Sequence, residues 1–359
     1  MTDLLDQRLH NQLLTRPTSN VEATVRHIGA IQAQDLPAAL WAIGVRTADS
    51  TVSSVKKAFN DGKVVRSWPM RGTLHVVIGT DLHWMLSLTA DRLIAGAARR
   101  REALQLDDRI IEHARSLAQE LLRDNKTATR AEFLSYLEDH GIAVSGQRGY
   151  HLIWNLAQTG TFCWGPFNDA GDQLLVLLDE WVPQPTRYEI DEALAEFFIR
   201  YLNGHAPATL ADFVSWSKLT LTQARRAAAI CADRVILTRI DEIEYYRRAE
   251  VELPAGASLA TSYALPGFDE YYLGYADRSA IATPTVVQGL VPGNNGIFRP
   301  MILQNGRVVG TWKRAVTRAG ISITVTPLDT PLPSFDSLAL LGETIARFWK
   351  IPFHHIVVE

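Results

Sequence analysis

Few groups of residues in this sequence have the types and spacing that chemistry requires. Three stand out: Gln32-Ala33-Gln34, the adjacent acids Asp269-Glu270, and the adjacent histidines His354-His355. Two glutamine carbonyls can position a water molecule and support developing positive charge. Two carboxylates can exchange protons with a substrate, and two histidines can bind a metal ion.

The acids and the histidines favour structural roles over catalytic ones. Adjacent residues of a strand point to opposite faces, so the two acids are interpreted as structural, paired with Arg278 or Arg299. A histidine pair near a chain end is more often solvated than metal-binding. Cys163 and Cys231 have no partners at zinc-finger spacing and form no disulfide framework. We therefore expect buried, reduced thiols, no metal and no cofactor.

The composition excludes several classes of protein. With 47% hydrophobic and 21% charged residues, the 359-residue chain can bury large cores. No apolar run reaches the roughly 18 residues of a membrane helix, and residues 1–16 lack a signal core, so we expect a cytoplasmic protein that does not enter a membrane. Phosphate-binding glycine loops, dinucleotide fingerprints and nucleophile elbows are also absent, which disfavours nucleotide-dependent enzymes and serine hydrolases.

Charge is segregated along the chain, although the net charge is only −3. Residues 278–328 contain six Lys or Arg and no acid, whereas residues 241–277 contain eight acids and two arginines. Such a basic segment can contact a polyanion even in a slightly acidic protein.

The elements that must position these residues follow a pattern of helices and then a hairpin, which occurs three times. Helices are predicted over 4–14, 19–31 and 53–60, over 109–122, 129–139 and 147–158, and over 191–202, 210–218 and 220–232. The paired strands that follow are predicted over 63–70 and 73–78, 161–166 and 173–178, and 235–239 and 243–247. A further helix is predicted over 80–93.

The remaining C-terminal part is predicted to form strands and one helix. Asn305-Gly306 predicts a type I′ hairpin turn, residues 293–296 predict a second turn, and Ser334 can cap a helix over 338–349. Three helices followed by a ribbon are typical of a winged helix. We predict an α+β fold with three tandem winged-helix units, at 1–106, 107–186 and 187–250, and a C-terminal α+β segment with basic, β-rich hairpins at 251–359.

A winged helix usually reads duplex DNA through its third helix, although the same fold also serves protein packing. The predicted third helices carry Lys56 and Lys57, then Gln147, Arg148, Tyr150 and His151, then Gln223, Arg225 and Arg226. Three unlike copies in one chain favour a monomer that grips double-stranded DNA, since regulators commonly dimerise to read repeated half-sites.

Several separated motifs resemble one family. They are the stretches Gly29 to Asp35 (GAIQAQD), Ala39 to Ala42 (ALWA), Arg66 to His75 (RSWPMRGTLH), Leu265 to Ser279 (LPGFDEYYLGYADRS) and Gly306 to Arg314 (GRVVGTWKR). In this order they look like the winged-helix DNA glycosylases of the AlkZ and YcaQ type, over nearly the whole chain. The resemblance implies three tandem winged helices that form a basic DNA-binding surface, and hydrolysis of the N-glycosidic bond of alkylated purines.

The resemblance also assigns catalytic residues. The AlkZ branch has a Gln-aliphatic-Gln motif, which Gln32 and Gln34 match, and the YcaQ branch has an acid at the last position. Asp35 lies one residue beyond that position and does not supply the acid. Residues two apart share a side only outside a regular helix, so we predict a break in helical geometry from Gln32 to Asp35.

Glutamine suits this reaction, although it cannot deprotonate water. A purine alkylated at a ring nitrogen is already cationic and leaves as a neutral base, so the enzyme mainly positions water and supports positive charge at the sugar. Unmodified purines should then be poor substrates, and bulky adducts are plausible ones.

Candidate DNA contacts lie on the first ribbon, the second unit and the basic segment. Arg66, Arg71 and His75 are candidates for contacts to phosphate or to the lesion, with packing of the wing as the alternative. The other candidates are Arg148, Arg299, Lys313 and Arg314.

Two other functions remain open at this stage. A non-enzymatic DNA-binding protein, such as a transcriptional regulator, would use the same fold, and a protein-interaction scaffold would bind its partner without steep salt dependence.

Overall fold

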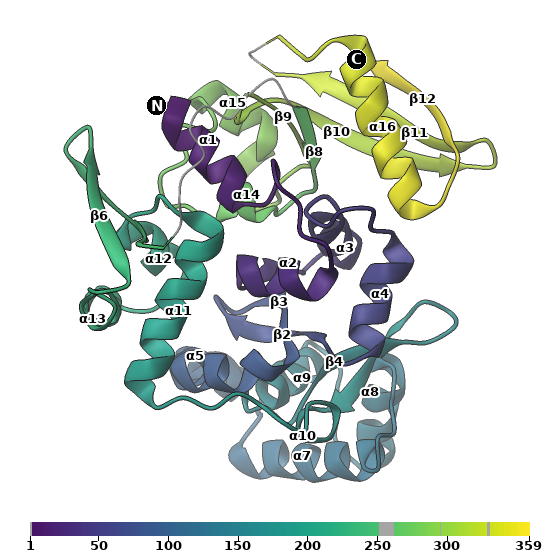
Figure 1. Cartoon of the computed structure of the whole chain (residues 1–359). Coiled ribbons are helices and arrows are strands. Elements are labelled where there is room, and N and C mark those ends of the chain that lie inside the picture. The colour runs from purple at the N-terminus through teal and green to yellow at the C-terminus, as the bar shows by residue number, and fades with distance from the viewer. Residues whose placement is uncertain (1, 251–261, 295, 329–330) are drawn as a thin grey trace. The chain divides into compact units, whose positions relative to one another are not determined.

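The computed structural model describes residues 2–250, 262–294, 296–328 and 331–359 (Figure 1). The chain forms two compact units: unit 1 is Met1–Val55 with Phe198–Glu359, and unit 2 is Lys56–Phe197. These limits differ from the predicted boundaries at 106, 186 and 250, so the division into winged helices remains a prediction. The α+β class is confirmed, because both units combine helices with strands.

Unit 2 contains an antiparallel sheet in the order β3 (Thr73–Ile78), β2 (Val64–Met70), β4 (Phe162–Phe167) and β5 (Gln173–Leu177). The two predicted hairpins therefore share one sheet, joined where Arg66 pairs with Trp164. Its helices are α5 (Leu82–Gly96), α6 (Ala98–Ala103), α7 (Asp108–Leu122), α8 (Arg130–Asp139), α9 (Arg148–Gln158) and α10 (Leu178–Trp181). Buried side chains of α7, α8, α9 and the sheet form one core, as the second predicted copy requires.

The N-terminal part of unit 1 contains one helix that the sequence did not predict. α1 (Thr2–Asn11) and α2 (Val21–Ile28) lie where helices were predicted, although each ends three residues before its predicted end. α4 (Val52–Asn60), which begins in unit 1, matches the expectation. Between them lie β1 (Ile31–Gln32) and the unpredicted α3 (Leu36–Gly44). Every residue of α3 from Ala39 onward is buried, so its sequence has no polar face and lacks the helical period.

The third predicted copy is present as α11 (Ile190–His205), α12 (Leu210–Ser217), α13 (Leu221–Ile230) and the hairpin β6 (Val235–Ile240) and β7 (Ile243–Arg248). Thr209 and Thr220 form capping boxes at the starts of α12 and α13, with Asp212 and Gln223 as the reciprocal partners. These boxes fix both helix starts, which lie within one residue of the predicted starts at 210 and 220.

The C-terminal part of unit 1 holds a second sheet, in the order β12 (Phe353–Val358), β11 (Gly320–Pro327), β10 (Arg307–Thr317), β9 (Met301–Gln304) and β8 (Ser262–Leu265). Only the β11–β12 pair among these neighbours is parallel. The helices are α14 (Glu270–Leu273), α15 (Pro284–Leu290) and α16 (Phe335–Trp349). None of the helices in the described ranges has the length and apolarity to cross a membrane.

Two predicted local features of this part, a hairpin turn and a helix cap, are confirmed. Asn305 and Gly306 have φ of 52° and 73°, as a type I′ turn between β9 and β10 requires. Ser334 caps α16 by accepting from the Ser337 amide. The other predicted turn includes Asn295, which lies outside the described residues, and Pro292–Asn294 before it form a 3-10 turn.

Candidate functional site

The motif Gln32-Ala33-Gln34 lies in an extended segment of unit 1. α2 ends at Ile28, where Gly29 takes a φ of 88° and donates its amide to the Val25 carbonyl. β1 follows, and α3 begins only after Asp35, whose side chain caps it through the Ala38 amide. The predicted break in helical geometry is therefore confirmed.

Exposure differs along the motif. Ala33 is buried, whereas Gln32 is half-buried and Gln34 is exposed. Ala33 therefore anchors the segment in the core, between two glutamines that are more exposed.

A buried carboxylate lies under the motif. Glu270, at the start of α14, accepts the backbone N–H of Gln32 at 3.2 Å through Oε1. Its Oε2 accepts the indole N–H of Trp216 at 2.8 Å, and the side chain is only 1% exposed. Glu270 is thus a fixed acceptor that holds the backbone of the first glutamine.

His205 is a fully buried side chain that packs beside Glu270. Its Nδ1 lies 3.0 Å from the Tyr201 carbonyl, which can only accept, so Nδ1 must donate. Its Nε2 lies 3.5 Å from Glu270 Oε2. The stacked ring of Tyr201, at 4.6 Å between centroids, fixes the imidazole.

The neighbouring acid, Asp269, belongs to a buried ion pair. Arg46 donates Nη1–H to Oδ2 at 2.9 Å and Nη2–H to Oδ1 at 2.7 Å, and both side chains are at most 1% exposed. The guanidinium also donates to Gln12 and to the Ala42 carbonyl, so all five of its N–H groups are used.

The structural interpretation of the two acids is supported, but their predicted partners were wrong. Asp269 pairs with Arg46 rather than with Arg278 or Arg299, and Glu270 receives the Gln32 amide and Trp216. Arg46 was missed because it follows the unpredicted α3, and Trp216 and His205 have no local signal. The nearby Tyr271, Tyr272 and Tyr275 are buried as well.

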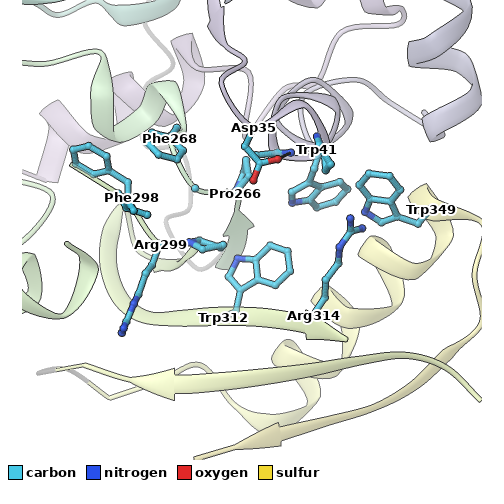
Figure 2. Close-up of a pocket in the computed structure, with 14 residues that line it drawn as sticks. Asp35, Trp41, Pro266, Phe268, Phe298, Arg299, Trp312, Arg314 and Trp349 are labelled. Carbon is cyan, nitrogen blue, oxygen red and sulfur yellow. Dashed lines mark hydrogen bonds between the residues drawn. The ribbon is translucent and has the colours of Figure 1, made fainter. Parts of the chain in front are cut away.

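Unit 1 also contains a cavity of about 320 Å³, and Asp35, the residue after Gln34, lines it. Its walls include the indoles of Trp41, Trp312 and Trp349, together with Phe268 (Figure 2). The Arg314 guanidinium lies 3.8 Å over the Trp349 ring, between Trp349 and Trp312. The cavity therefore offers aromatic surfaces beside the last residue of the motif segment.

The predicted basic residues of unit 1 differ in their surroundings. Arg314 lines the cavity, and burial lowers its pKa while nearby Asp35 raises it. Arg299 is exposed at the cavity rim, and its side chain extends away from the indoles in Figure 2. Lys313 is 71% exposed and lies 3.5 Å from Glu359. Lys313 and Arg299 remain accessible to a phosphate.

The candidate DNA contacts on the first ribbon make hydrogen bonds within unit 2. His75 is fully buried; it donates Nδ1–H to the Thr73 carbonyl and accepts from Arg71 through Nε2 at 2.8 Å. His75 therefore positions Arg71 and does not itself reach solvent, which is a correction to its predicted role as a contact. Arg66 donates to Gln173 and lies 5.6 Å from the Trp164 ring.

Arg148, at the start of α9, has its guanidinium occupied by the backbone. It donates to the carbonyls of Ala143, Leu104 and Gln105. The side chain therefore ties the loop before α9 to the end of α6, and a DNA contact would have to compete with these bonds. Within the described residues, no group of three or more His, Cys, Asp or Glu side chains could hold a metal ion.

Comparisons with known proteins identify the family and the fold. A family described as "DNA glycosylase AlkZ-like" matches residues 25–349. An interstrand DNA cross-link repair glycosylase of Streptomyces sahachiroi is 27% identical over 327 residues, which is 85% of each chain. The solved DNA glycosylase AlkZ of Streptomyces sahachiroi superposes with a TM-score of 0.84 at 22% identity, covering 100% of this chain and 99% of that one, which shows the shared fold.

Proposed function

Because the chain belongs to the AlkZ-like DNA glycosylase family, we propose that it hydrolyses the N-glycosidic bond of alkylated purines in duplex DNA through Gln32 and Gln34. The enzyme is a DNA glycosylase, and DNA is its substrate. The proposal concerns which bases it releases and which residues act.

In the proposed reaction, the bond between C1′ of the sugar and the purine nitrogen breaks, and the electron pair leaves with the base. An N7- or N3-alkylated purine leaves as a neutral molecule, so no general acid is needed. The side-chain carbonyls of Gln32 and Gln34 orient a water molecule on the opposite face of the sugar and support its positive charge. The water oxygen bonds to C1′, and its proton passes to solvent.

The observation that supports this assignment is the break in helical geometry at the motif. Gln32 and Gln34 are both more exposed than Ala33 between them, and Glu270 holds the Gln32 amide. A helical motif would have pointed the two side chains apart. The segment Ile31 to Asp35 contains no lysine, which fits water as the nucleophile of a monofunctional glycosylase.

We further propose that the enzyme acts as a monomer on chromosomal DNA in the cytoplasm. The proposed contacts to the DNA backbone are Arg71, Arg299, Lys313 and Arg314. Arg66 and Arg148 are further proposed contacts, and each would have to give up its present hydrogen bonds to bind a phosphate. The relative from Streptomyces sahachiroi is named for interstrand cross-link repair, which makes a purine joined to the opposite strand a second substrate to test.

The test is base release from duplexes that contain one 7-methylguanine or one guanine–guanine N7 cross-link. Wild type should release 7-methylguanine, and Gln32→Ala/Gln34→Ala should not. Gln119→Ala, an exposed glutamine of α7, is the matched control and should behave like wild type. Salt-sensitive duplex binding without release by wild type would contradict the proposal and favour a non-enzymatic DNA-binding role.

A further inference from the structure

The cavity beside Asp35 has the features of a binding site for a flat ring. Trp41 and Trp312 donate their indole N–H groups to the carbonyls of Ala264 and Leu265, each at 2.8 Å. These are consecutive residues of β8, so the two indoles are fixed to one strand. Because their polar atoms are satisfied, the rings offer the cavity only apolar and π surface.

The charges of the cavity favour stacking over ion binding. Arg314 lies with its guanidinium 3.8 Å over the Trp349 ring, and Asp35 provides a carboxylate nearby. These two charges oppose each other, and Arg299, the third charged residue of the lining, extends away from the indoles. A guanidinium plane and aromatic rings are the surfaces on which proteins stack nucleobases and other planar heterocycles.

The position of the cavity links it to the reaction. Asp35 follows Gln34 directly, and Asp35, Ala38 and Trp41 all line the cavity. Consecutive Cα atoms are about 3.8 Å apart, so the cavity wall begins one residue from the second glutamine. A ring bound here would lie beside the purine whose glycosidic bond is attacked.

Motifs far apart in the sequence meet at this cavity. Trp41, Phe268 and Trp312 come from three of the separated stretches that resemble the glycosylase family, and all three line it. Gly267 in the same wall admits no side chain, because a Cβ atom there would lie 2.4 Å from the Phe298 carbonyl oxygen. The volume of about 320 Å³ falls in the range of small-ligand pockets.

We propose that this cavity binds a planar, largely neutral aromatic ring during catalysis. The ring is either an aromatic substituent carried by the alkylated purine or an unpaired nucleobase next to it. This inference rests on the proposed function, since it places the ring next to the base that Gln32 and Gln34 release.

Kinetics on two lesions separate the two sources. Wild type, Trp349→Leu and the control Phe335→Leu, which removes an exposed aromatic at the other end of α16, are compared on duplexes with one 7-methylguanine or one 7-benzylguanine. A substituent in the cavity predicts that Trp349→Leu raises KM at least about fivefold for the benzyl lesion alone, whereas a nucleobase predicts an equal rise for both. Unchanged KM for both lesions, or the same effect in Phe335→Leu, would overturn the proposal.

A titration without DNA tests the cavity independently of base release. Free 7-benzylguanine should quench the tryptophan fluorescence of wild type saturably, and Trp349→Leu should bind it at least about fivefold more weakly. Absence of saturable quenching, or equal affinity in Trp349→Leu, would contradict ring binding. If wild type releases neither base but the quenching is as expected, the proposed reaction fails while the binding site stands.

Discussion

Two neighbouring regions of unit 1 contain similar residue types, but one supports the motif and the other lines a cavity. The buried cluster under the motif contains Arg46, Asp269, Glu270 and Trp216, whose charged and polar groups bond to one another or to backbone. The cavity beside the motif also contains arginine, aspartate and tryptophan, but its rings and the guanidinium of Arg314 line open space. Residue type therefore does not separate support from binding, whereas the open space that the side chains line does.

Removing an acid from the buried cluster should have the largest effect. Asp269→Ala leaves the Arg46 guanidinium buried without its counter-charge, and loss of one partner of such a pair costs about 3–5 kcal/mol. Urea unfolding measures the change. The control Asp61→Ala removes the partner of Lys57 in an exposed pair, and should cost less than about 1 kcal/mol. Equal losses in both variants would break the distinction between the two regions.

A milder substitution should separate an effect on the position of the motif from an effect on the stability of the fold. Glu270→Gln keeps the shape of the side chain but can turn an N–H toward the Gln32 amide or the Trp216 indole. We expect the single-turnover rate of base release to fall about 10- to 100-fold, because small misplacement of a reacting group has costs of this size. DNA affinity should be unchanged. A drop in affinity with an unchanged rate would show that Glu270 does not act through the motif.

The smallest expected effect is on the exposed charges. Lys313→Ala removes one accessible cation of β10, next to Arg314 of the cavity. A lost phosphate contact reduces the slope of log DNA affinity against log salt concentration by about 0.9. Arg148→Ala should change this slope less, since its guanidinium is bonded to backbone. Titrations of duplex DNA at several salt concentrations compare the two, and a larger change in Arg148→Ala would reverse our ranking.

Local signals explain what could be predicted from the sequence. Asn305-Gly306 as a turn and Ser334 before α16 both act within a few residues, so their elements were found. The extended motif was also predictable, because two glutamines two apart can meet only outside a helix. These features depend on neighbours along the chain.

The rest of the site depends on partners far apart in the sequence. Arg46 and Asp269 are 223 residues apart, and no local pattern indicates that they pair. α3 is buried from Ala39 onward and therefore carries no helical period. His75 was a candidate because of its place on the first ribbon, whereas its burial against Arg71 is decided by the sheet around it.

The most direct test of the account is the single-turnover rate of 7-methylguanine release by Gln34→Ala. Gln34 is exposed, so its loss should leave folding and DNA affinity intact while the rate falls about 100-fold, because the water is no longer oriented. A rate within twofold of wild type, measured with protein in excess over a bound duplex, would contradict the assignment of the motif as the catalytic centre.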